Sequence, residues 1–540
     1  MLPDGEERRD TWNDRLDGTV KQVVTIPKEA VADASTILVK IYPGLFSQAV
    51  EGLDALLRMP FGCFEQTSSV TYPNVLVLDY LKSAKMAKPE VQMKAEQYIN
   101  VGYQRLLSFE VKGGGFSWFG EAPAHKVLTS YGLLEFRDMS RVHEVDENVI
   151  TRTQNWLAGL QQKDGSWEPD QGGIAEGIIN RQTDTLRVTA YITWALAESG
   201  YKGAAVEKAF GYLGAHWREA KDPYALAVIA NAYLSSGRKT DVTADVLAAL
   251  AKLATVEGPV AYWKTDAPTF TYAEKGSADL ETTALAAYAL VKSGRYADLT
   301  NKAITYLIRG KDSFGTWQTT QATVWALKTL LLSMRQAAQE MDGTVTVTVN
   351  GKEAASFRIT PADYDVVRQV DARSLVQPGQ NDVSITLKGK GSALYQIVAK
   401  YYMPWALVKP AAEKLLTIDV SYDRAKLATD DIITASVRVV NNDPREVKMV
   451  VVDLGLPPGF ALMTEDFDKL VADKTIQKYT VAARQIIVYL DKLASRKPLE
   501  FSYRLRAKFP MKAATPASTV YRYYNPEIKA TAKPAELEVR

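Results

Sequence analysis

The feature of this sequence that most limits its fold is a long central stretch of helical pattern between two stretches of strand pattern. Within residues 48–339, apolar residues recur every three or four positions, and Ala, Leu, Glu and Lys are abundant, as is typical of amphipathic helices. Residues 20–41 contain two runs rich in β-branched side chains, and such runs return after Met341. We therefore expect an α-helical domain flanked by β domains, and a chain of 540 residues can hold about three domains.

The C-terminal stretch predicts many strands. Residues 344–349 alternate Thr and Val and end in Asn350-Gly351, the dipeptide that most strongly favours a tight hairpin. A turn is predicted at residues 441–444, Asn-Asn-Asp-Pro. The further strands are expected at residues 382–387, 395–402, 432–440, 447–454, 485–490 and 499–505.

The helical stretch carries a loose internal repeat. Helices of similar character recur, and three of them end in Ser-Gly, a common helix stop. Aromatic-rich turns lie between the helices, around Trp118, Trp167 and Trp317, and we interpret them as packed junctions of the scaffold. Helix pairs repeated at intervals of roughly forty residues favour an α/α toroid, in which paired helices close around a centre. The recurring helices are expected at residues 128–136, 188–200, 224–237, 281–294 and 320–332.

Charge and cysteine content exclude several classes of function. Lys plus Arg number 65 against 63 Asp plus Glu, so no broad electrostatic field favours nucleic acid as a partner. No apolar run in the sequence approaches the roughly 18 residues of a membrane span. The single cysteine, Cys63, excludes disulfides within the chain and Cys-pair zinc sites, and three scattered histidines disfavour a His-rich metal site. We expect no metal and no cofactor.

Residues 59–81, MPFGCFEQTSSVTYPNVLVLDYL, contain the pair of residues that carries chemistry. A Pro and a Gly before the cysteine predict a loop and a helix that begins near Cys63. Cys63 and Gln66 are three positions apart and would share one face of that helix. Attack of the Cys63 sulfur on the Gln66 side-chain amide, with loss of ammonia, would join them as a thioester. Glu65 lies between them and could carry protons.

A helix start would favour this reaction in two ways. Its free N–H groups lower the pKa of a thiol, so we expect Cys63 to be an activated nucleophile. The same N–H groups would stabilise the oxyanion that forms when the Gln66 carbonyl is attacked. By spacing alone, however, a Cys-x-x-Gln pair often occurs by chance, and a lone cysteine is more often a small buried apolar residue.

The run as a whole resembles the thioester-containing proteins, the alpha-2-macroglobulins and complement components, whose signature is Gly-Cys-Gly-Glu-Gln. The likeness continues through residues 73–81 and covers most of the chain. It implies a thioester domain that is an α/α toroid, inserted in a β-rich CUB domain and followed by a β-sandwich receptor-binding domain of the macroglobulin type. Residues 488–493 and 520–525 look like strands of that last domain. The implied domains are residues 1–47 and 341–408 for the CUB segments, 48–340 for the toroid and 409–540 for the receptor-binding-like domain.

Two departures from the family pattern refine the resemblance. Phe64 stands in place of the second glycine of the signature, a position that bacterial macroglobulins tend to fill with a bulky apolar residue. Residues 167–176, equivalent to the stretch that holds the acyl-accepting histidine of complement proteins, contain no histidine, which implies direct transfer to amines. We interpret His125 and His143 as structural or surface residues, since nothing near them in the sequence forms a triad.

The resemblance implies a protease trap that bonds covalently to a target's lysine amine once the thioester is uncovered. Such a step happens once per molecule, so the protein is not expected to be an enzyme. Tyr523 and Tyr524 are the candidates for shielding the thioester from water, and they are equally well explained as strand-face residues. The chain looks like a monomeric C-terminal piece of a bacterial macroglobulin, periplasmic or extracellular, with a role in bacterial defence.

Two other classes of function stay open on the sequence. An α/α-toroid enzyme, such as a terpene cyclase or a glycosidase, would need catalytic acids at the mouth of the toroid, and only Asp184 with Thr183 and Thr185 stands out. A binding module would leave Cys63 unmodified and bind a surface receptor through its β domains. Turnover of an isoprenoid would favour the enzyme, and binding that methylamine leaves unchanged would favour the binding module.

Overall fold

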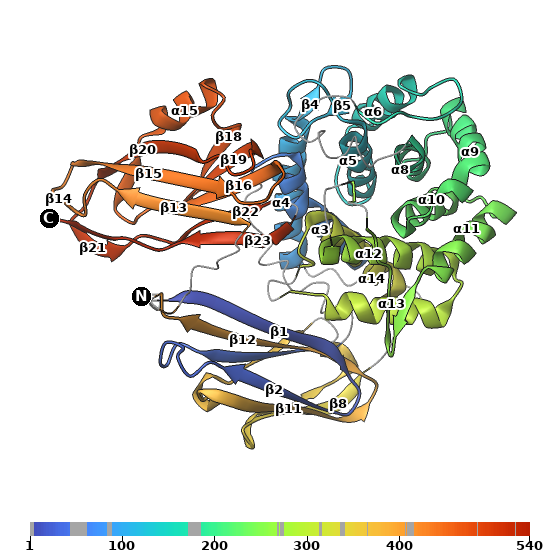
Figure 1. The fold of residues 1–540 in the computed structure, drawn as a ribbon. Helices are drawn as coiled ribbons and strands as arrows, with labels where there is room; N and C mark the ends of the chain where they lie inside the picture. Colours follow the sequence, from blue (N-terminus) through green and yellow to red (C-terminus); the bar gives the residue numbers. More distant parts are fainter. Residues whose placement is uncertain are drawn as a thin grey trace. The chain divides into compact units, whose positions relative to one another are not determined.

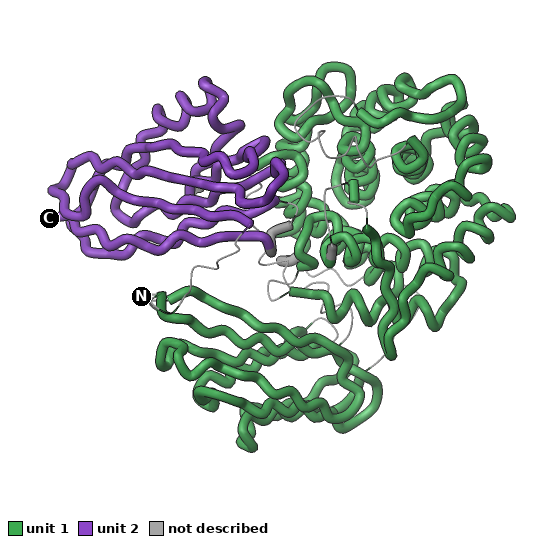
Figure 2. Tube along the Cα trace, in the orientation of Figure 1, with its two compact units in different colours: residues 1–173, 178–408 green, residues 174–177, 409–540 purple. Residues whose placement is uncertain are grey.

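The computed structural model describes residues 5–43, 62–83, 89–170, 185–266, 269–270, 275–312, 316–334, 341–363, 366–405, 407, 415–482, 484–523 and 525–540. The chain forms two compact units (Figure 2). The larger unit lies within residues 1–408, and residues 409–540 make up most of the smaller one.

Two four-stranded sheets form a β-sandwich in the larger unit (Figure 1). Their strand orders are β1-β12-β3-β10 and β2-β11-β8-β9, and their inward side chains, such as Val39, Val347 and Ile397, share one core. Because β12 lies between β1 and β3, strands from before and after the helical stretch alternate, and the helices are an insertion in the sandwich. The strands are β1 (Glu6–Leu16), β2 (Thr19–Ile26), β3 (Thr36–Tyr42), β8 (Asp342–Val349), β9 (Lys352–Ile359), β10 (Arg368–Asp371), β11 (Gly379–Lys390) and β12 (Ala393–Met403).

Two strands of this sandwich, β1 and β10, are not predicted by the sequence pattern. The predicted hairpin is confirmed: β8 and β9 meet at Asn350 and Gly351, whose φ angles are 53° and 77°, as a type I′ turn requires. The segment EERRDTWNDRL of β1, in contrast, has the charge content of a loop. β1 lies at an edge of its sheet, where charged side chains are tolerated and discourage pairing with other chains.

Within the described residues, six helices close into an inner ring, each packed on the next and the last on the first, in the order α3, α5, α8, α10, α12, α14. A second helix packs on the outside of five of them, α4 on α3, α6 on α5, α9 on α8, α11 on α10 and α13 on α12. The predicted α/α toroid is therefore confirmed (Figure 1). The inner helices are α3 (Phe64–Ser83), α5 (Lys126–Met139), α8 (Thr185–Glu198), α10 (Pro223–Ser235), α12 (Lys275–Ser293) and α14 (Thr320–Met334); the outer ones are α4 (Pro89–Leu107), α6 (Glu147–Gly159), α9 (Ala204–His216), α11 (Asp241–Lys252) and α13 (Ala297–Arg309).

Inner and outer helices differ in which faces they bury. α8 is buried without a break from Leu186 to Leu196, whereas α13 buries one apolar face and exposes the other, as an amphipathic helix does. The five helices predicted from the sequence all belong to the inner ring. Their Ser-Gly stops are confirmed, since Gly200, Gly237 and Gly294 have φ angles of 81°, 72° and 65°, the left-handed conformation of a helix end.

Two of the predicted aromatic turns, around Trp167 and Trp317, are junctions of the scaffold, and Trp263, which the sequence analysis did not single out, makes a third. At the predicted turn around Trp118, the N–H of Phe116 donates to the Thr129 hydroxyl of α5 at 2.8 Å. At each of three turns a buried Trp donates its backbone N–H to a Thr hydroxyl of an inner helix, and its indole N–H to a carbonyl of the preceding outer helix. These paired bonds fix one helix pair to the next. The partners are Thr189 and Leu157 for Trp167 (2.9 and 2.7 Å), Thr283 and Leu250 for Trp263 (3.1 and 2.7 Å), and Thr323 and Leu307 for Trp317 (3.0 and 2.6 Å).

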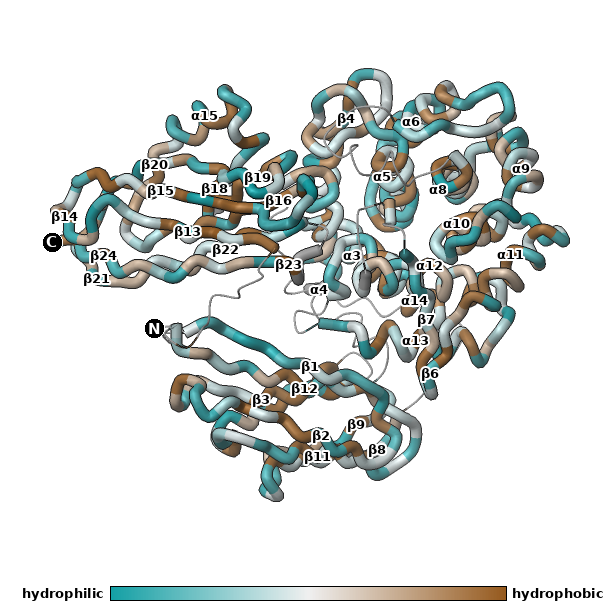
Figure 3. Tube along the Cα trace, in the orientation of Figure 1, coloured by the Kyte–Doolittle hydropathy of each residue, from teal (hydrophilic) through white to brown (hydrophobic). Residues whose placement is uncertain are grey.

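The smaller unit is a β-sandwich with its own core. Its larger sheets have the orders β13-β15-β20-β17 and β18-β19-β16-β22-β23, and hydrophobic stretches run along β15 and β16 (Figure 3). The predicted turn at residues 441–444 connects β15 to β16, which belong to different sheets. The elements are β13 (Leu416–Tyr422), β14 (Lys426–Leu427), β15 (Ile432–Asn441), β16 (Val447–Gly455), β17 (Phe460–Leu462), α15 (Thr464–Ala472), β18 (Lys478–Ala482), β19 (Gln485–Leu493), β20 (Leu499–Ala507), β21 (Met511–Ala514), β22 (Ser518–Arg522), β23 (Asn525–Ala532) and β24 (Glu536–Val539).

Candidate functional site

Cys63 lies directly before α3 and is completely buried. The structure brings the predicted pair together, because the Cys63 backbone N–H donates to the side-chain oxygen Oε1 of Gln66 at 3.1 Å. Gly62 has a φ of 85°, which glycine adopts without strain, and it turns the chain into the helix. The amide carbon that the sulfur would attack is therefore held at the first turn of α3.

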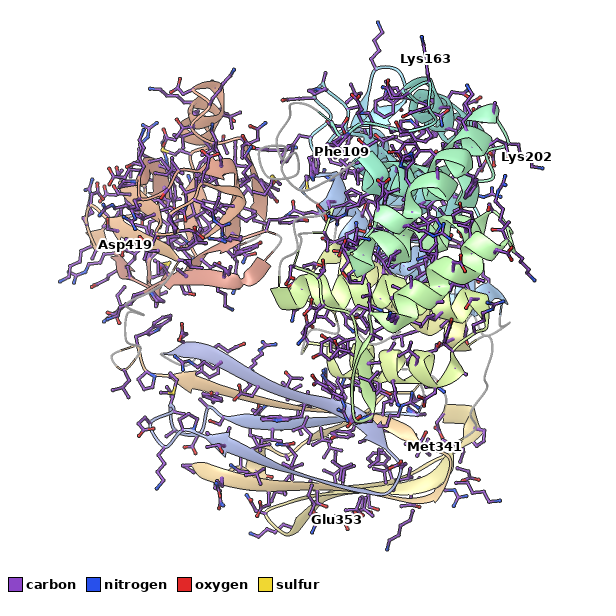
Figure 4. All side chains as sticks on the ribbon, turned by 45° about the vertical axis from the view of Figure 1, so that its right-hand side comes forward. Phe109, Lys163, Lys202, Met341, Glu353 and Asp419 are labelled. Carbon is purple, nitrogen blue, oxygen red and sulfur yellow. The ribbon has the colours of Figure 1, made fainter. Side chains whose placement is uncertain are left out.

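The start of α3 is fixed by contacts from neighbouring segments. The Phe64 N–H donates to the Trp118 carbonyl at 2.8 Å, and the Arg105 guanidinium donates to the Gly62 carbonyl at 2.8 Å. The Phe64 ring packs against the rings of Phe109 and Phe116, with centroids 6.2 and 5.5 Å away; Phe109 is labelled in Figure 4. The bulky residue after the cysteine thus anchors the helix start in the ring.

The thiol of Cys63 is not activated, contrary to the expectation from the sequence. Burial raises the pKa of the Cys63 thiol to about 12, and the nearby Glu65 carboxylate adds to the rise. Backbone hydrogen bonds at the helix start lower this pKa, but their effect is smaller than that of burial. An unmodified Cys63 is consequently protonated at neutral pH, and its attack on Gln66 requires a base.

Glu65 is buried and lines a cavity of about 20 Å³ at the N-terminal ends of the inner helices, large enough for one water molecule. Tyr224 and Gln321, each the second residue of its inner helix, line it from α10 and α14. Half of the lining residues are aromatic, so the cavity combines apolar walls with a carboxyl group. The other lining residues are Trp118, His125, Val127, Leu128, Tyr131, Tyr191 and Phe270.

His125 caps a helix and does not act as a base. Its Nδ1 accepts the backbone N–H of Leu128 at 3.3 Å, and its Nε2 lies 3.5 Å from the Asp170 carboxylate. Both ring nitrogens are therefore engaged, and burial lowers the pKa of His125. The interpretation of His125 as a structural residue is therefore correct, and the side chain is buried rather than on the surface. His143 is partly exposed and packs edge-on against Tyr103.

A buried ionic cluster, which the sequence analysis missed, lies toward the C-terminal ends of the inner helices. The Asp138 carboxylate accepts from Lys328 and from the Tyr72 hydroxyl, both at 2.6 Å. Glu198 pairs with Lys292 at 3.0 Å and accepts from Ser235. The available signal was a charge inside an otherwise apolar helix, such as the lysine in TQATVWALKTLLLSM of α14, since a lysine is almost never fully buried unless it is paired.

Several predicted positions fall in the smaller unit or outside the described residues. Tyr523 lies in the turn between β22 and β23, is partly exposed, and donates its backbone N–H to the Met449 carbonyl at 2.9 Å. Tyr524, residues 171–176 and Asp184 lie outside the described residues. Among the residues that the structure describes, no group of His, Cys, Asp or Glu is arranged to hold a metal ion, and no helix is both long and apolar enough for a membrane span.

Comparison with known proteins gives consistent matches along the chain. Residues 36–332, more than half of the chain, match the model of the A-macroglobulin TED domain, and residues 445–534 match that of the A-macroglobulin receptor binding domain. The chain is 26% identical over 555 residues to ovostatin from Gallus gallus; the match covers 98% of this chain and 37% of that protein. The chain therefore spans little more than a third of the length of that relative.

Two solved structures share the fold. One is a crystal structure of native alpha-2-macroglobulin from Escherichia coli that spans the residues from domain MG7 to the C-terminus, with a TM-score of 0.70, 18% identity and coverage of 100% of this chain and 83% of that chain. The other is Salmonella alpha-2-macroglobulin reacted with methylamine, with a TM-score of 0.71, 17% identity and coverage of 99% of this chain and 34% of that chain.

Proposed function

Because the chain belongs to the A-macroglobulin family, we propose that it stores a thioester between Cys63 and Gln66 and uses it to trap proteases covalently. The observation that carries this proposal is the hydrogen bond from the Cys63 N–H to the Gln66 side-chain oxygen at a buried helix start. That contact keeps the two partners of the bond within one turn of α3, inside a protein environment that excludes water.

Formation of the thioester would proceed within this pocket. The Cys63 sulfur attacks the Gln66 side-chain carbon, the amide C–N bond breaks, and ammonia leaves with the proton of the thiol. The negative charge that develops on Oε1 is stabilised by the Cys63 N–H, which already donates to that atom. Since the thiol of Cys63 has a raised pKa, a base must take its proton, and Glu65 is the carboxyl group next to it.

The stored bond would then react with an amine. A lysine of a trapped protease attacks the Gln66 carbonyl carbon, an amide forms, the C–S bond breaks, and Cys63 becomes a thiol again. The acyl group is used once, so we expect a stoichiometric inhibitor rather than an enzyme with turnover. A relative of the same fold is known in its methylamine-reacted form, and methylamine is accordingly the small probe for this chain.

Intact-mass spectrometry tests the proposal. Freshly purified protein should have a mass one ammonia below the sequence mass, and methylamine should add its own mass and release the Cys63 thiol. The variant Cys63→Ser, which cannot close the bond, should have its full sequence mass. Alkylation of the native protein is a weaker test, because a buried thiol of raised pKa reacts slowly even when it is not bonded. A full-mass wild-type chain that was never exposed to amines would refute the thioester.

Shielding of the bond is a second testable part of the proposal. Tyr523 and Tyr524 have large flat side chains that exclude water at low entropic cost, and the resemblance to macroglobulins assigns them this role. Replacing both by Ala should shorten the lifetime of the methylamine-reactive thioester, measured by loss of amine incorporation over time. Phe509→Ala, which removes an exposed aromatic side chain of the same unit, is the matched control. Equal lifetimes of the thioester in the two variants would mean that the tyrosines do not shield it.

We also propose the domain limits and the location that the resemblance implies. Residues 1–47 and 341–408 would form a CUB domain around the toroid of residues 48–340, and residues 409–540 would form the receptor-binding-like domain. A periplasmic or extracellular location and monomeric state fit such a protein. Limited proteolysis tests the limits, because the cuts should fall near residues 340 and 408 and spare the ring of helices.

A further inference from the structure

Two stripes of polar residues face each other between α3 and α5 inside the ring. On α3, Ser68 lies one turn after Glu65, and on α5, Glu135 lies one turn after Tyr131. Residues three or four positions apart share a helix face, and these two helices are packed together. The stripes therefore start at the cavity that Glu65 lines, two residues from Cys63 in the sequence, and continue along the facing sides of α3 and α5.

The contacts between the stripes are short. The Ser68 hydroxyl donates to the Glu135 carboxyl at 2.5 Å, and Ser68 also lies close enough to the Tyr131 hydroxyl to affect its ionisation. Tyr131 and Glu65 line the same cavity. Both Tyr131 and Glu135 are buried, with 2% and 0% of their surface exposed, and within the described chain the Tyr131 hydroxyl and one Glu135 oxygen have no hydrogen-bond partner. These groups form a polar path that packing alone does not explain.

Glu135 is able to exchange a proton near neutral pH. Burial raises the pKa of Glu135 to about 8, the Asp138 carboxylate adds to the rise, and the hydrogen bond from Ser68 opposes it. The titratable groups that interact with it are Asp138 and Tyr131 on its own helix and Tyr72 on α3. Tyr191 on α8 acts on Tyr131, and Lys328 on α14 acts on Asp138. Lys328 is already paired with Asp138, so its charge does not hold Glu135 in the ionised form.

We propose that Glu135 is the proton acceptor of the acyl-transfer step, connected through Tyr131 and Ser68 to the cavity that Glu65 lines. This inference rests on the proposed thioester. In the step, the amine nitrogen bonds to the Gln66 carbon and the C–S bond breaks. The proton that the amine loses passes by way of the cavity to Glu135, and a proton returns along the same path to the Cys63 sulfur, so that no other reactant is consumed.

The test is the pH dependence of thiol release by methylamine, measured on the whole chain and expressed per concentration of unprotonated amine. For the wild type this rate should rise through about pH 8, because Glu135 accepts a proton only in its ionised form. In Glu135→Gln the rise of the rate with pH should disappear. The rate at alkaline pH should fall by about tenfold, a loss smaller than the usual full contribution of a general base.

Two further variants keep the result decisive. Tyr131→Phe keeps the ring packing and interrupts the path, so it should also lose the rise while Glu135 is still present. Glu198→Gln removes a largely buried carboxyl at the other end of the inner helices and should behave as the wild type. If both path variants fold but fail to close the thioester, and Glu198→Gln closes it, then the path is needed for closure as well, which supports the inference.

The outcomes separate the two proposals. A thioester of normal mass in Glu135→Gln together with an unchanged rise through pH 8 would overturn the role of Glu135 and leave the thioester intact. The same unchanged rise in Tyr131→Phe would overturn the path. A wild-type chain of full sequence mass would overturn both.

Discussion

The two ends of the inner ring of helices use buried charge in opposite ways. At the N-terminal ends, Glu65 lines a small aromatic cavity, and Tyr131 keeps a buried hydroxyl without a partner in the described chain. Toward the C-terminal ends, Asp138, Lys328 and Lys292 belong to ion pairs at 2.6 to 3.0 Å. One end thus keeps polar groups available for chemistry, and the other neutralises its charges.

The helix direction explains this division. The inner helices place their N-terminal ends around the cavity, where the backbone dipoles favour negative charge, such as Glu65 or a developing oxyanion. Near the C-terminal ends the dipoles favour cations, and Lys292 in the last turn of α12 meets this preference. The same architecture therefore suits the proposed acyl group at one end and a charge-neutralised core at the other.

The largest expected effect comes from breaking the paired end. Lys328→Met leaves Asp138 without its buried counter-ion and should lower the free energy of unfolding by about 3–5 kcal/mol, the usual cost of removing one partner of a buried pair. Urea denaturation measures this change. Lys302→Ala removes a surface pair with Asp298 and should change the free energy by less than about 1 kcal/mol. Equal effects would mean that burial adds nothing to the contribution of the Asp138–Lys328 pair.

Two buried carboxyls of the inner ring, Glu135 and Glu198, should respond to pH in opposite directions. The pKa of Glu135 is raised to about 8 in the folded chain, so its contribution to stability is complete at acid pH and is lost as pH rises from about 4.5 through 8, a change of about 5 kcal/mol. The pKa of Glu198 is lowered to about 2 by Lys328 and Lys292 despite its burial. Its contribution is present above about pH 4.5 and is lost as pH falls toward 2.

Denaturation of Glu135→Gln and Glu198→Gln across this range checks the signs. In Glu135→Gln the free energy of unfolding should depend less on pH than in the wild type on the alkaline side. In Glu198→Gln it should depend less on pH on the acid side. A single variant that weakens the pH dependence of stability on both the acid and the alkaline side would mean that the two carboxyls belong to one coupled network.

A smaller effect is expected from crowding the reactive end. A methyl group on Gly132 would come within 2.7 Å of the Phe64 ring, and that ring is held by Phe109 and Phe116, so Gly132→Ala should destabilise the chain by about 1–3 kcal/mol. Gly211, in the exposed outer helix α9, has open space around it, and Gly211→Ala should stabilise by up to about 1 kcal/mol. Thermal denaturation distinguishes the signs, and two changes of equal sign would contradict the packing described for Phe64.

Much of the fold follows from local sequence signals. The inner helices are predictable because they are largely apolar, and three of them end in a glycine. The β8–β9 hairpin is predictable from Asn350-Gly351. The Cys63–Gln66 contact also follows from a spacing of three residues at a helix start. In these cases the physical cause lies within a few residues of the feature.

The missed features depend on tertiary context. The sequence of β1 has no strand pattern. It forms a strand because it pairs with β12 at the edge of the sheet. The raised pKa of Cys63 comes from burial that the sequence does not show, and it outweighs the helix start. Likewise, Lys328 and Asp138 lie 190 residues apart, so no local pattern pairs them.

The pairing of β1 with β12 has a consequence for synthesis of the chain. Leu16 is paired with Ala393. After β1 is synthesised, roughly 380 further residues must therefore be added before its partner strand exists, which takes about 20–80 s at ordinary elongation rates. An apolar strand left unpaired for that time would attract other nascent chains. The charges of EERRDTWNDRL keep this early segment soluble until the ring of helices is complete and the last strands of the sandwich arrive.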